Sequence, residues 1–135
     1  MTWRGSLVRI ATYEVETLQK RLVEIVERRN HAEMRLVMLE AEVEAETDHA
    51  ARDSEARPYM DDYMRGVRVR RSVIKAGIAA IAQEEAGARD ALVQAFEAQK
   101  KFEQVAELAR VAEVKETARL DTITLDELGM RASGR

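Results

Sequence analysis

The two histidines have the side chains best suited to metal binding, and their spacing excludes a shared site. His31 and His49 are eighteen residues apart. On a helix that separation is five turns, so the side chains share a face but lie about 27 Å apart. Each has an acidic residue four positions away, Glu27 and Asp53, which is the spacing of ordinary surface pairing. We therefore expect no metal site and no catalytic histidine.

Other common reactive groups are missing or lack a suitable setting. The chain has no cysteine, which excludes disulfides, a thiol nucleophile and thiolate metal ligands. Its six glycines are scattered and form no phosphate-binding loop. Carboxylates are plentiful, but paired helices have no cavity that desolvates two of them and separates their pKa values. The sequence predicts a protein that is not an enzyme, with no catalytic residue, cofactor or small-molecule substrate.

The composition is typical of a long-helix or coiled-coil protein. Only 4% of the 135 residues are aromatic, 35% are charged, and there is one proline. The net charge of −3 does not draw the chain to nucleic acid or anionic lipid. No apolar run is long enough to cross a membrane, and no basic and apolar leader opens the chain. We expect a soluble, cytoplasmic protein.

Two heptad patterns predict two long helices. Positions spaced alternately four and three residues apart from Ala11 to Ala50 are apolar in ten of twelve cases, with Arg29 and Glu46 as exceptions. The same spacing from Met60 to Ala109 is apolar in twelve of fifteen. Such spacing favours a helix with one apolar stripe and is incompatible with the alternation of a strand.

The only proline divides the two patterns. Pro58 disfavours helical geometry at Arg57 and suits the first turn of a new helix, while Asp53 and Ser54 provide capping oxygens. The prediction is an all-α fold, a long antiparallel two-helix coiled-coil hairpin with unequal helices in one domain over 1–135. Its parts are helix one at about 3–52, a turn at about 53–58, helix two at about 59–120 and a tail at 121–135. In the tail, Thr122 or Thr124 is expected to cap a last short helix and Gly129 to end it.

Charge is distributed in opposite blocks around the turn. Acidic residues dominate 40–55 and arginines dominate 57–71. An antiparallel hairpin brings these blocks together, which fixes the register; docking by the charge left exposed is an open alternative. With the bend near residue 56, Arg29 falls level with Glu85, so we expect an ion pair across the seam. No aromatic residues interleave the arginines to stack bases, so no nucleic-acid partner is expected.

Three segments resemble the FliJ family of the flagellar type III export apparatus. These are the opening heptads from Ser6 to Leu39, the post-turn segment 59–64 with Val67, and the end of the chain, where 100–102 leads to Leu125-Asp126-Glu127-Leu128 and Arg131. One feature departs from the family. Glu42 and Glu46 stand where family members carry aromatics on the first helix, which argues against a partner contact of that kind there.

The resemblance implies a non-catalytic stalk and adaptor that couples the export ATPase ring to the membrane export gate and to export chaperones. It implies a cytoplasmic location at the inner-membrane export apparatus, flagellar or of the related injectisome. The implied ATPase-binding residues are Trp3, Leu7, Val8, Arg9, Arg110, Lys115, Arg119, Leu120, Leu125 and Leu128. The implied gate-binding residues are Leu39, Tyr59, Tyr63, Val67 and Ile74. Valines outside the main seam keep an alternative open: a self-associating structural coiled coil without an ATPase partner.

Overall fold

The computed structural model describes residues 2–134, and helices account for nearly all of them. The order is α1 (Trp3–Arg52), a short 3₁₀ turn η1 (Arg57–Tyr59) and α2 (Met60–Ser133), with 50, 3 and 74 residues. The described residues contain no strand, so the predicted all-α fold with unequal helices is confirmed. None of these helices has an apolar stretch that could span a bilayer.

The turn is built by backbone and side-chain hydrogen bonds around Asp53. The N–H of Asp53 donates to the His49 carbonyl (3.0 Å) and closes α1. The Asp53 carboxylate then accepts a hydrogen bond from the N–H of Glu55 (3.0 Å). Pro58 stands in the first turn of η1, where its fixed φ is compatible with helix, and no side chain caps η1. Asp53 therefore shapes the turn. The prediction that its carboxylate caps the second helix is wrong.

The predicted break after residue 120 is wrong, because α2 continues to Ser133. The Thr122 hydroxyl donates to the Ala118 carbonyl (2.9 Å), and the Thr124 hydroxyl donates to the Leu120 carbonyl (3.0 Å). These bonds satisfy both hydroxyls inside a helix, so neither residue acts as a cap. Gly129 lies within α2 and has no positive φ. No proline follows Pro58 to end the helix earlier.

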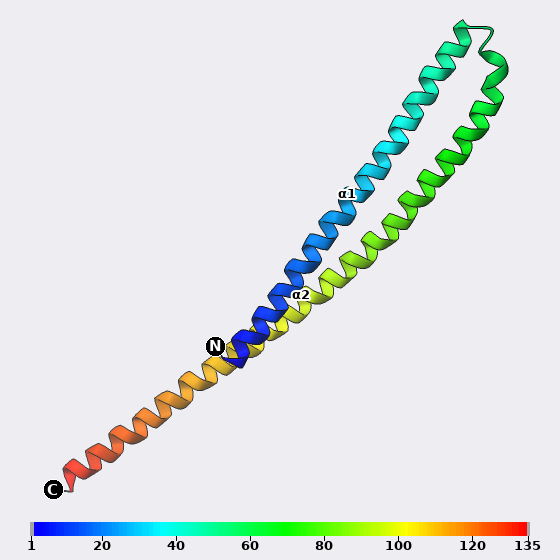
Figure 1. The fold of residues 1–135 in the computed structure, drawn as a ribbon. Helices are drawn as coiled ribbons and strands as arrows, with labels where there is room; N and C mark the ends of the chain where they lie inside the picture. The colour runs from blue at the N-terminus through cyan, green and yellow to red at the C-terminus, as the bar shows by residue number, and fades with distance from the viewer. Residues whose placement is uncertain (1, 135) are drawn as a thin grey trace. The chain divides into compact units, whose positions relative to one another are not determined.

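The chain divides into two compact units, each made of parts of both helices. One unit is Thr17–Leu92, and the other combines Met1–Glu16 with Val93–Arg135. Within Thr17–Leu92, Figure 1 shows the cyan part of α1 beside the green part of α2. Arg28 pairs with Glu84 and Glu40 pairs with Arg71, so residue numbers rise on one helix as they fall on the other. The helices of this unit are antiparallel.

The buried side chains follow the heptad patterns. All nine buried apolar residues occupy predicted seam positions: Ala11, Val15, Ile25, Ala32, Leu39, Ala50, Val67, Ala88 and Ala95. Ala32 is 0% exposed and Val67 is 1% exposed, so the helices of the unit Thr17–Leu92 approach closely there. Two predicted seam positions differ: Glu46 is exposed, and Phe102 keeps 36% of its surface exposed.

In the second unit, the beginning of α1 packs against the middle part of α2. The Gln99 amide donates to the Thr12 hydroxyl (3.2 Å), which itself donates to the Val8 carbonyl (2.9 Å). Further along α2, the Glu113 carboxylate still binds Arg4 of α1, and every described residue from Val114 onward is exposed. Within this unit, Figure 1 shows no part of α1 beside the red end of α2. This segment is a helix without an intramolecular partner helix.

Candidate partner-binding surfaces

The ten residues predicted to bind the ATPase all lie in the unit formed by Met1–Glu16 and Val93–Arg135. Trp3 begins α1 and is 60% exposed. Leu7 and Val8 are half-buried, whereas Arg9 is exposed. The first two turns of α1 therefore present one large aromatic side chain to solvent while two aliphatic residues pack inward.

An ion pair that the sequence analysis missed joins the two helices beside Trp3. Both terminal nitrogens of Arg4 donate to the Glu113 carboxylate, at 2.7 and 2.8 Å. This hydrogen bonding holds the pKa of Glu113 below its ordinary value and raises the pKa of Arg4. With the bend near residue 56, the predicted register places Arg4 roughly level with residue 109, one helical turn from Glu113. The pair could therefore have been predicted from the sequence. The pair fixes the first turn of α1 to α2.

The basic residues of the α2 segment differ in how they are paired. Arg110 binds Glu107 (2.8 Å) and Arg119 binds Glu116 (2.7 Å), each within one turn of α2. These contacts lower the pKa values of both carboxyl groups. Lys115 has no ion-pair partner among the residues that the structure describes. Of Arg110, Lys115 and Arg119, Lys115 is therefore the one whose positive charge is not balanced by a neighbouring carboxylate.

The predicted leucines of α2 are exposed but do not share one face. Leu120, Leu125 and Leu128 keep 50%, 68% and 53% of their surfaces exposed. Leu125 and Leu128 are three residues apart and adjacent on the helix surface, whereas Leu120 lies about 140° from Leu125 around the axis. Val114, 57% exposed, falls about 20° from Leu125 and was missed. The heptad spacing of Val114, Ala118 and Leu125 could have predicted that these three side chains share one face of α2.

The five residues predicted to bind the gate all lie in the unit Thr17–Leu92, but two of them are buried. Leu39 is 5% exposed and Val67 is 1% exposed, because both pack in the seam between α1 and α2. They leave almost no side-chain surface for a partner, so we assign them to packing. Tyr59 is 73% exposed, and Tyr63 and Ile74 are half-buried. These three are the accessible members of the predicted surface.

Tyr63 carries an unsatisfied hydroxyl. Its oxygen is buried and has no hydrogen-bond partner among the described residues. Burial raises the pKa of Tyr63, and the nearby charges of Glu42 and Glu46 raise it further. The phenol therefore stays protonated at neutral pH and is a hydrogen-bond donor without an acceptor.

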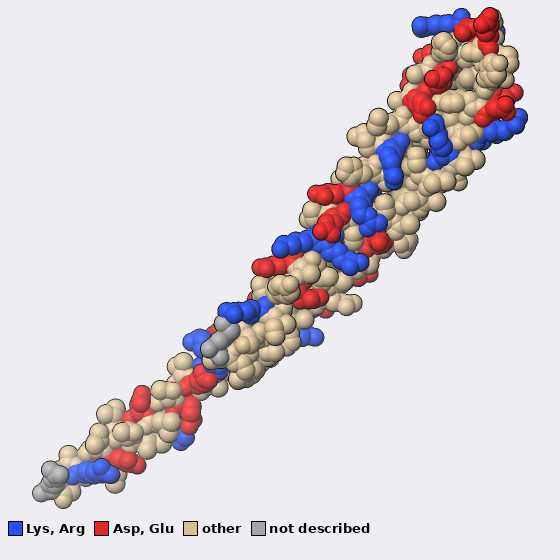
Figure 2. All heavy atoms as spheres, in the orientation of Figure 1, with Lys and Arg blue, Asp and Glu red and all other residues tan. Residues whose placement is uncertain are grey.

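The opposite charge blocks meet as predicted within the unit Thr17–Leu92. Arg71 binds Glu40 (2.6 and 3.0 Å) and Arg70 binds Glu42 (2.9 Å). The contact with Arg71 lowers the pKa of Glu40. Figure 2 shows basic and acidic atoms side by side along the molecular surface in view. These two ion pairs hold the register between the blocks.

The predicted ion pair across the seam is confirmed. Arg29 donates to Glu85 from the opposite helix, and Arg89 binds the other oxygen of the same carboxylate (3.2 Å). Among the described residues, no group of three or more His, Cys, Asp or Glu side chains is arranged to hold a metal ion. Arg29, Glu85 and Arg89 therefore form a charged network between α1 and α2.

The fold and these surfaces define a coiled-coil hairpin protein with exposed apolar and aromatic side chains. The chain is 50% identical over 129 residues to the flagellar FliJ protein of Caulobacter vibrioides strain NA1000 / CB15N. The match covers 96% of this chain and 93% of that relative, and the FliJ protein of strain ATCC 19089 / CIP 103742 / CB 15 matches to the same extent. No protein-family model and no solved structure matches the chain. The chain belongs to the FliJ family of flagellar proteins.

Proposed function

We propose that this protein is a non-catalytic stalk and adaptor of the flagellar type III protein export apparatus. In this role it couples the export ATPase ring to the cytoplasmic part of the membrane export gate and receives export chaperones. The observation that carries the proposal is the 50% identity to a flagellar FliJ protein over 96% of the chain. The work takes place in the cytoplasm, at the inner-membrane export apparatus.

The unpartnered end of α2 supports the contact with the ATPase. Leu125 and Leu128 form an exposed apolar face on a helix that has no α1 segment beside it. Trp3 adds an exposed indole within the same unit. A tryptophan side chain of this kind anchors protein interfaces when a partner covers it, and adjacent exposed leucines add apolar area. The ion pair between Arg4 and Glu113 keeps Trp3 close to α2.

The accessible residues near the turn support the contact with the gate. Tyr59 precedes α2 directly and is 73% exposed, and Tyr63, half-buried, follows one turn later. Aromatic residues with a polar tip are favoured at interfaces because they supply both apolar area and hydrogen bonds.

Self-association is the second candidate function. Several apolar side chains on the outer faces of the helices are more than half exposed, among them Val23, Val37, Val69, Val73 and Val93. In a larger helical assembly such residues form additional seams. The two functions differ in the partner they require, and the difference can be measured.

The test uses the purified full-length protein and the export ATPase of the same organism. Binding is measured by titration, and the oligomeric state of the protein alone by light scattering. We expect a complex, and we expect the double variant Trp3→Ala/Leu125→Ala to lose it while keeping its helical circular dichroism. A matched control, Val23→Ala/Val69→Ala, removes exposed apolar groups elsewhere and should bind normally.

Equal binding by both double variants would contradict the proposed ATPase surface. Failure of the unaltered protein to bind the ATPase, together with a tetramer or larger assembly in solution, would favour the structural coiled coil. Affinity purification from the native cytoplasm with mass spectrometry then tests the gate and the chaperones as further partners.

A further inference from the structure

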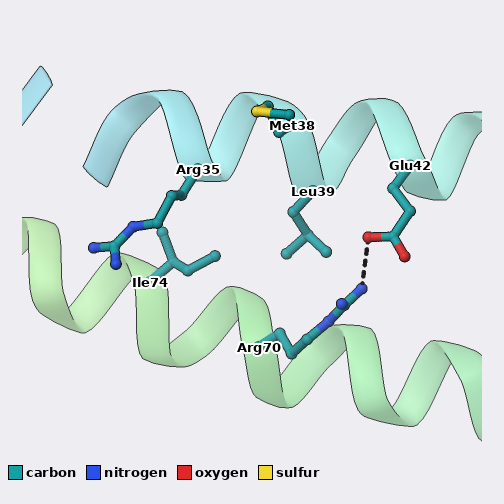
Figure 3. Close-up of a pocket in the computed structure, with 6 residues that line it drawn as sticks. All are labelled: Arg35, Met38, Leu39, Glu42, Arg70 and Ile74. Atoms are coloured by element: carbon teal, nitrogen blue, oxygen red, sulfur yellow. Dashed lines mark hydrogen bonds and ion pairs between the residues drawn. The ribbon is translucent and has the colours of Figure 1, made fainter. Parts of the chain in front are cut away.

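A hollow lies between α1 and α2 on one face of the unit Thr17–Leu92. It is lined by Arg35, Met38, Leu39, Glu42, Arg70 and Ile74. Figure 3 shows Leu39 directed toward α2, with Arg35 of α1 extending beside Ile74. Glu42 reaches Arg70 across the space between the helices (2.9 Å). The hollow thus has an apolar centre with charged groups at its sides.

Two further hollows continue this one in both directions. Toward lower residue numbers on α1, a second hollow shares Arg35 and Met38 with the first and extends to Arg28. Its lining includes Met34 from α1 and Ile81 from α2. A third hollow completes the series on the side toward the turn. The three hollows together, which begin at Arg28, are called the interhelical groove.

The third hollow extends the groove toward the turn. It shares Glu42 and Arg70 with the first hollow and reaches Tyr63 and Gly66 on α2. A side chain added at Gly66 would meet no atom within 4 Å, so the groove has open space beside that residue. From Glu42 to Arg28 the groove follows α1 for fourteen residues, or about 21 Å, close to four helical turns.

The shape and lining of the groove suit a helix more than a small molecule. It is open along its length, and its apolar side chains recur at intervals of four to seven residues, as in Met34 and Met38 or Ile74 and Ile81. Met34 and Met38 keep 56% and 66% of their surfaces exposed. Methionine side chains are flexible and polarisable, and they are common on surfaces that accept amphipathic helices.

The charge of the groove indicates which side chains the occupant carries. Arg28 is paired with Glu84, Arg70 with Glu42, and Asp62 of the third hollow with Arg65. Arg35 lines two of the three hollows and forms no ion pair or hydrogen bond with any described residue. His31 lines the second hollow as well and has no acidic partner among the described residues. The uncompensated charge of the groove is therefore positive, at Arg35.

We propose that the interhelical groove binds an amphipathic helix of a partner protein, with an apolar stripe over the methionines and carboxylates facing Arg35. The proposal gives the turn-proximal surface a partner class, and to that extent it rests on the proposed function. It does not depend on binding of the ATPase.

The experiment titrates the full-length protein with two stapled helical peptides of about eighteen residues, slightly longer than the groove. Both carry the same leucine stripe, one flanked by glutamates and the other by lysines. Binding is followed by the methyl NMR signals of Met34 and Met38, assigned by Met→Leu variants, with Met130 in the other unit as an internal control. We expect the glutamate peptide to shift the first two signals and to bind at least about tenfold more tightly.

Charge reversal provides the decisive control. Arg35→Glu should reverse the preference between the peptides, while Arg68→Glu, an exposed arginine that lines none of the three hollows, should leave it unchanged. Equal binding of the two peptides, or unshifted Met34 and Met38 signals, would overturn the proposal. Shifts that depend on protein concentration without peptide would also overturn it, because they would show a second copy in the groove. Loss of ATPase binding alone would contradict only the proposed function.

Discussion

Arg29 of α1 and Glu85 of α2 form an ion pair at two seam positions where the heptad pattern otherwise places apolar side chains. The side chains are 31% and 12% exposed, so the pair is partly desolvated. Arg89 and Glu33 extend it into a network of four charges. A partly buried pair of this kind specifies which residues face one another more than it adds stability.

Breaking the pair should cost more than breaking an exposed one. Glu85→Ala leaves Arg29 without its partner across the seam, and we expect a loss of about 1–3 kcal/mol in the free energy of unfolding. Glu84→Ala, which removes the exposed pair with Arg28, should cost below about 1 kcal/mol. The double variant Arg29→Leu/Glu85→Leu should recover the loss. Urea unfolding followed by circular dichroism measures all three, and equal losses for the two single variants would contradict this ranking.

The tightest helix contact predicts a second effect on stability. Ala32 is 0% exposed in the seam, so Ala32→Leu must push α1 and α2 apart and should lower the free energy of unfolding by about 1–3 kcal/mol. Ala41→Leu makes the same change at an exposed position of α1 and should alter it by no more than about 0.5 kcal/mol. Thermal unfolding compares the two variants. If Ala32→Leu is tolerated as well as Ala41→Leu, the seam is wider there than the structure shows.

A glycine inside α2 offers a stabilising substitution. A Cβ at Gly77 would meet no atom within 4 Å, and its φ is not positive. Gly77→Ala should therefore raise the free energy of unfolding by about 0.5–1 kcal/mol through the better helix propensity of alanine. The neighbouring change Ala76→Gly should lower it by a similar amount. The shift of the urea midpoint gives the sign, and a destabilised Gly77→Ala variant would show that the space is occupied.

The ion pair between Arg4 and Glu113 predicts a measurable pKa. Because Arg4 holds the pKa of Glu113 below its ordinary value, Arg4→Gln should return that pKa upward, and Arg9→Gln should leave it unchanged. Carboxyl carbon NMR titration of Glu113 measures the change. The pair's contribution to stability is present above the ordinary pKa of a glutamate and is lost as the pH falls through the lowered value. Acid unfolding of the Arg4→Gln variant should accordingly be less steep.

The unpartnered end of α2 should exchange its amide hydrogens quickly. Residues 114–133 are helical and exposed, with no α1 segment beside them, and a helix of this length without packing is only marginally stable in water. We expect exchange on the order of 100-fold faster than for amides near Val67. Hydrogen exchange with mass spectrometry measures the ratio. Equal protection would mean that another surface covers this segment in solution.

Heptad spacing by itself was sufficient to predict the buried seam and the register of the two helices. Every buried apolar residue falls on a predicted seam position, and the distance of Arg29 and Glu85 from the turn was enough to predict their contact. Both results follow from geometry, because a helix converts spacing into a face and a short turn converts residue number into register. The family resemblance also came from the sequence and is supported by the flagellar relatives.

Tertiary structure decided which residues a partner can reach, whereas hydrogen bonds within α2 decided how far that helix continues. The resemblance implied that Leu39 and Val67 bind the gate, but both occupy predicted seam positions and the facing helix buries them. Thr122, Thr124 and Gly129 resemble a helix boundary, but the threonine hydroxyls bond to carbonyls one turn back and the helix continues. The interhelical groove has no sequence signature, because its lining combines residues of α1 and α2 that come together only once the two helices pack.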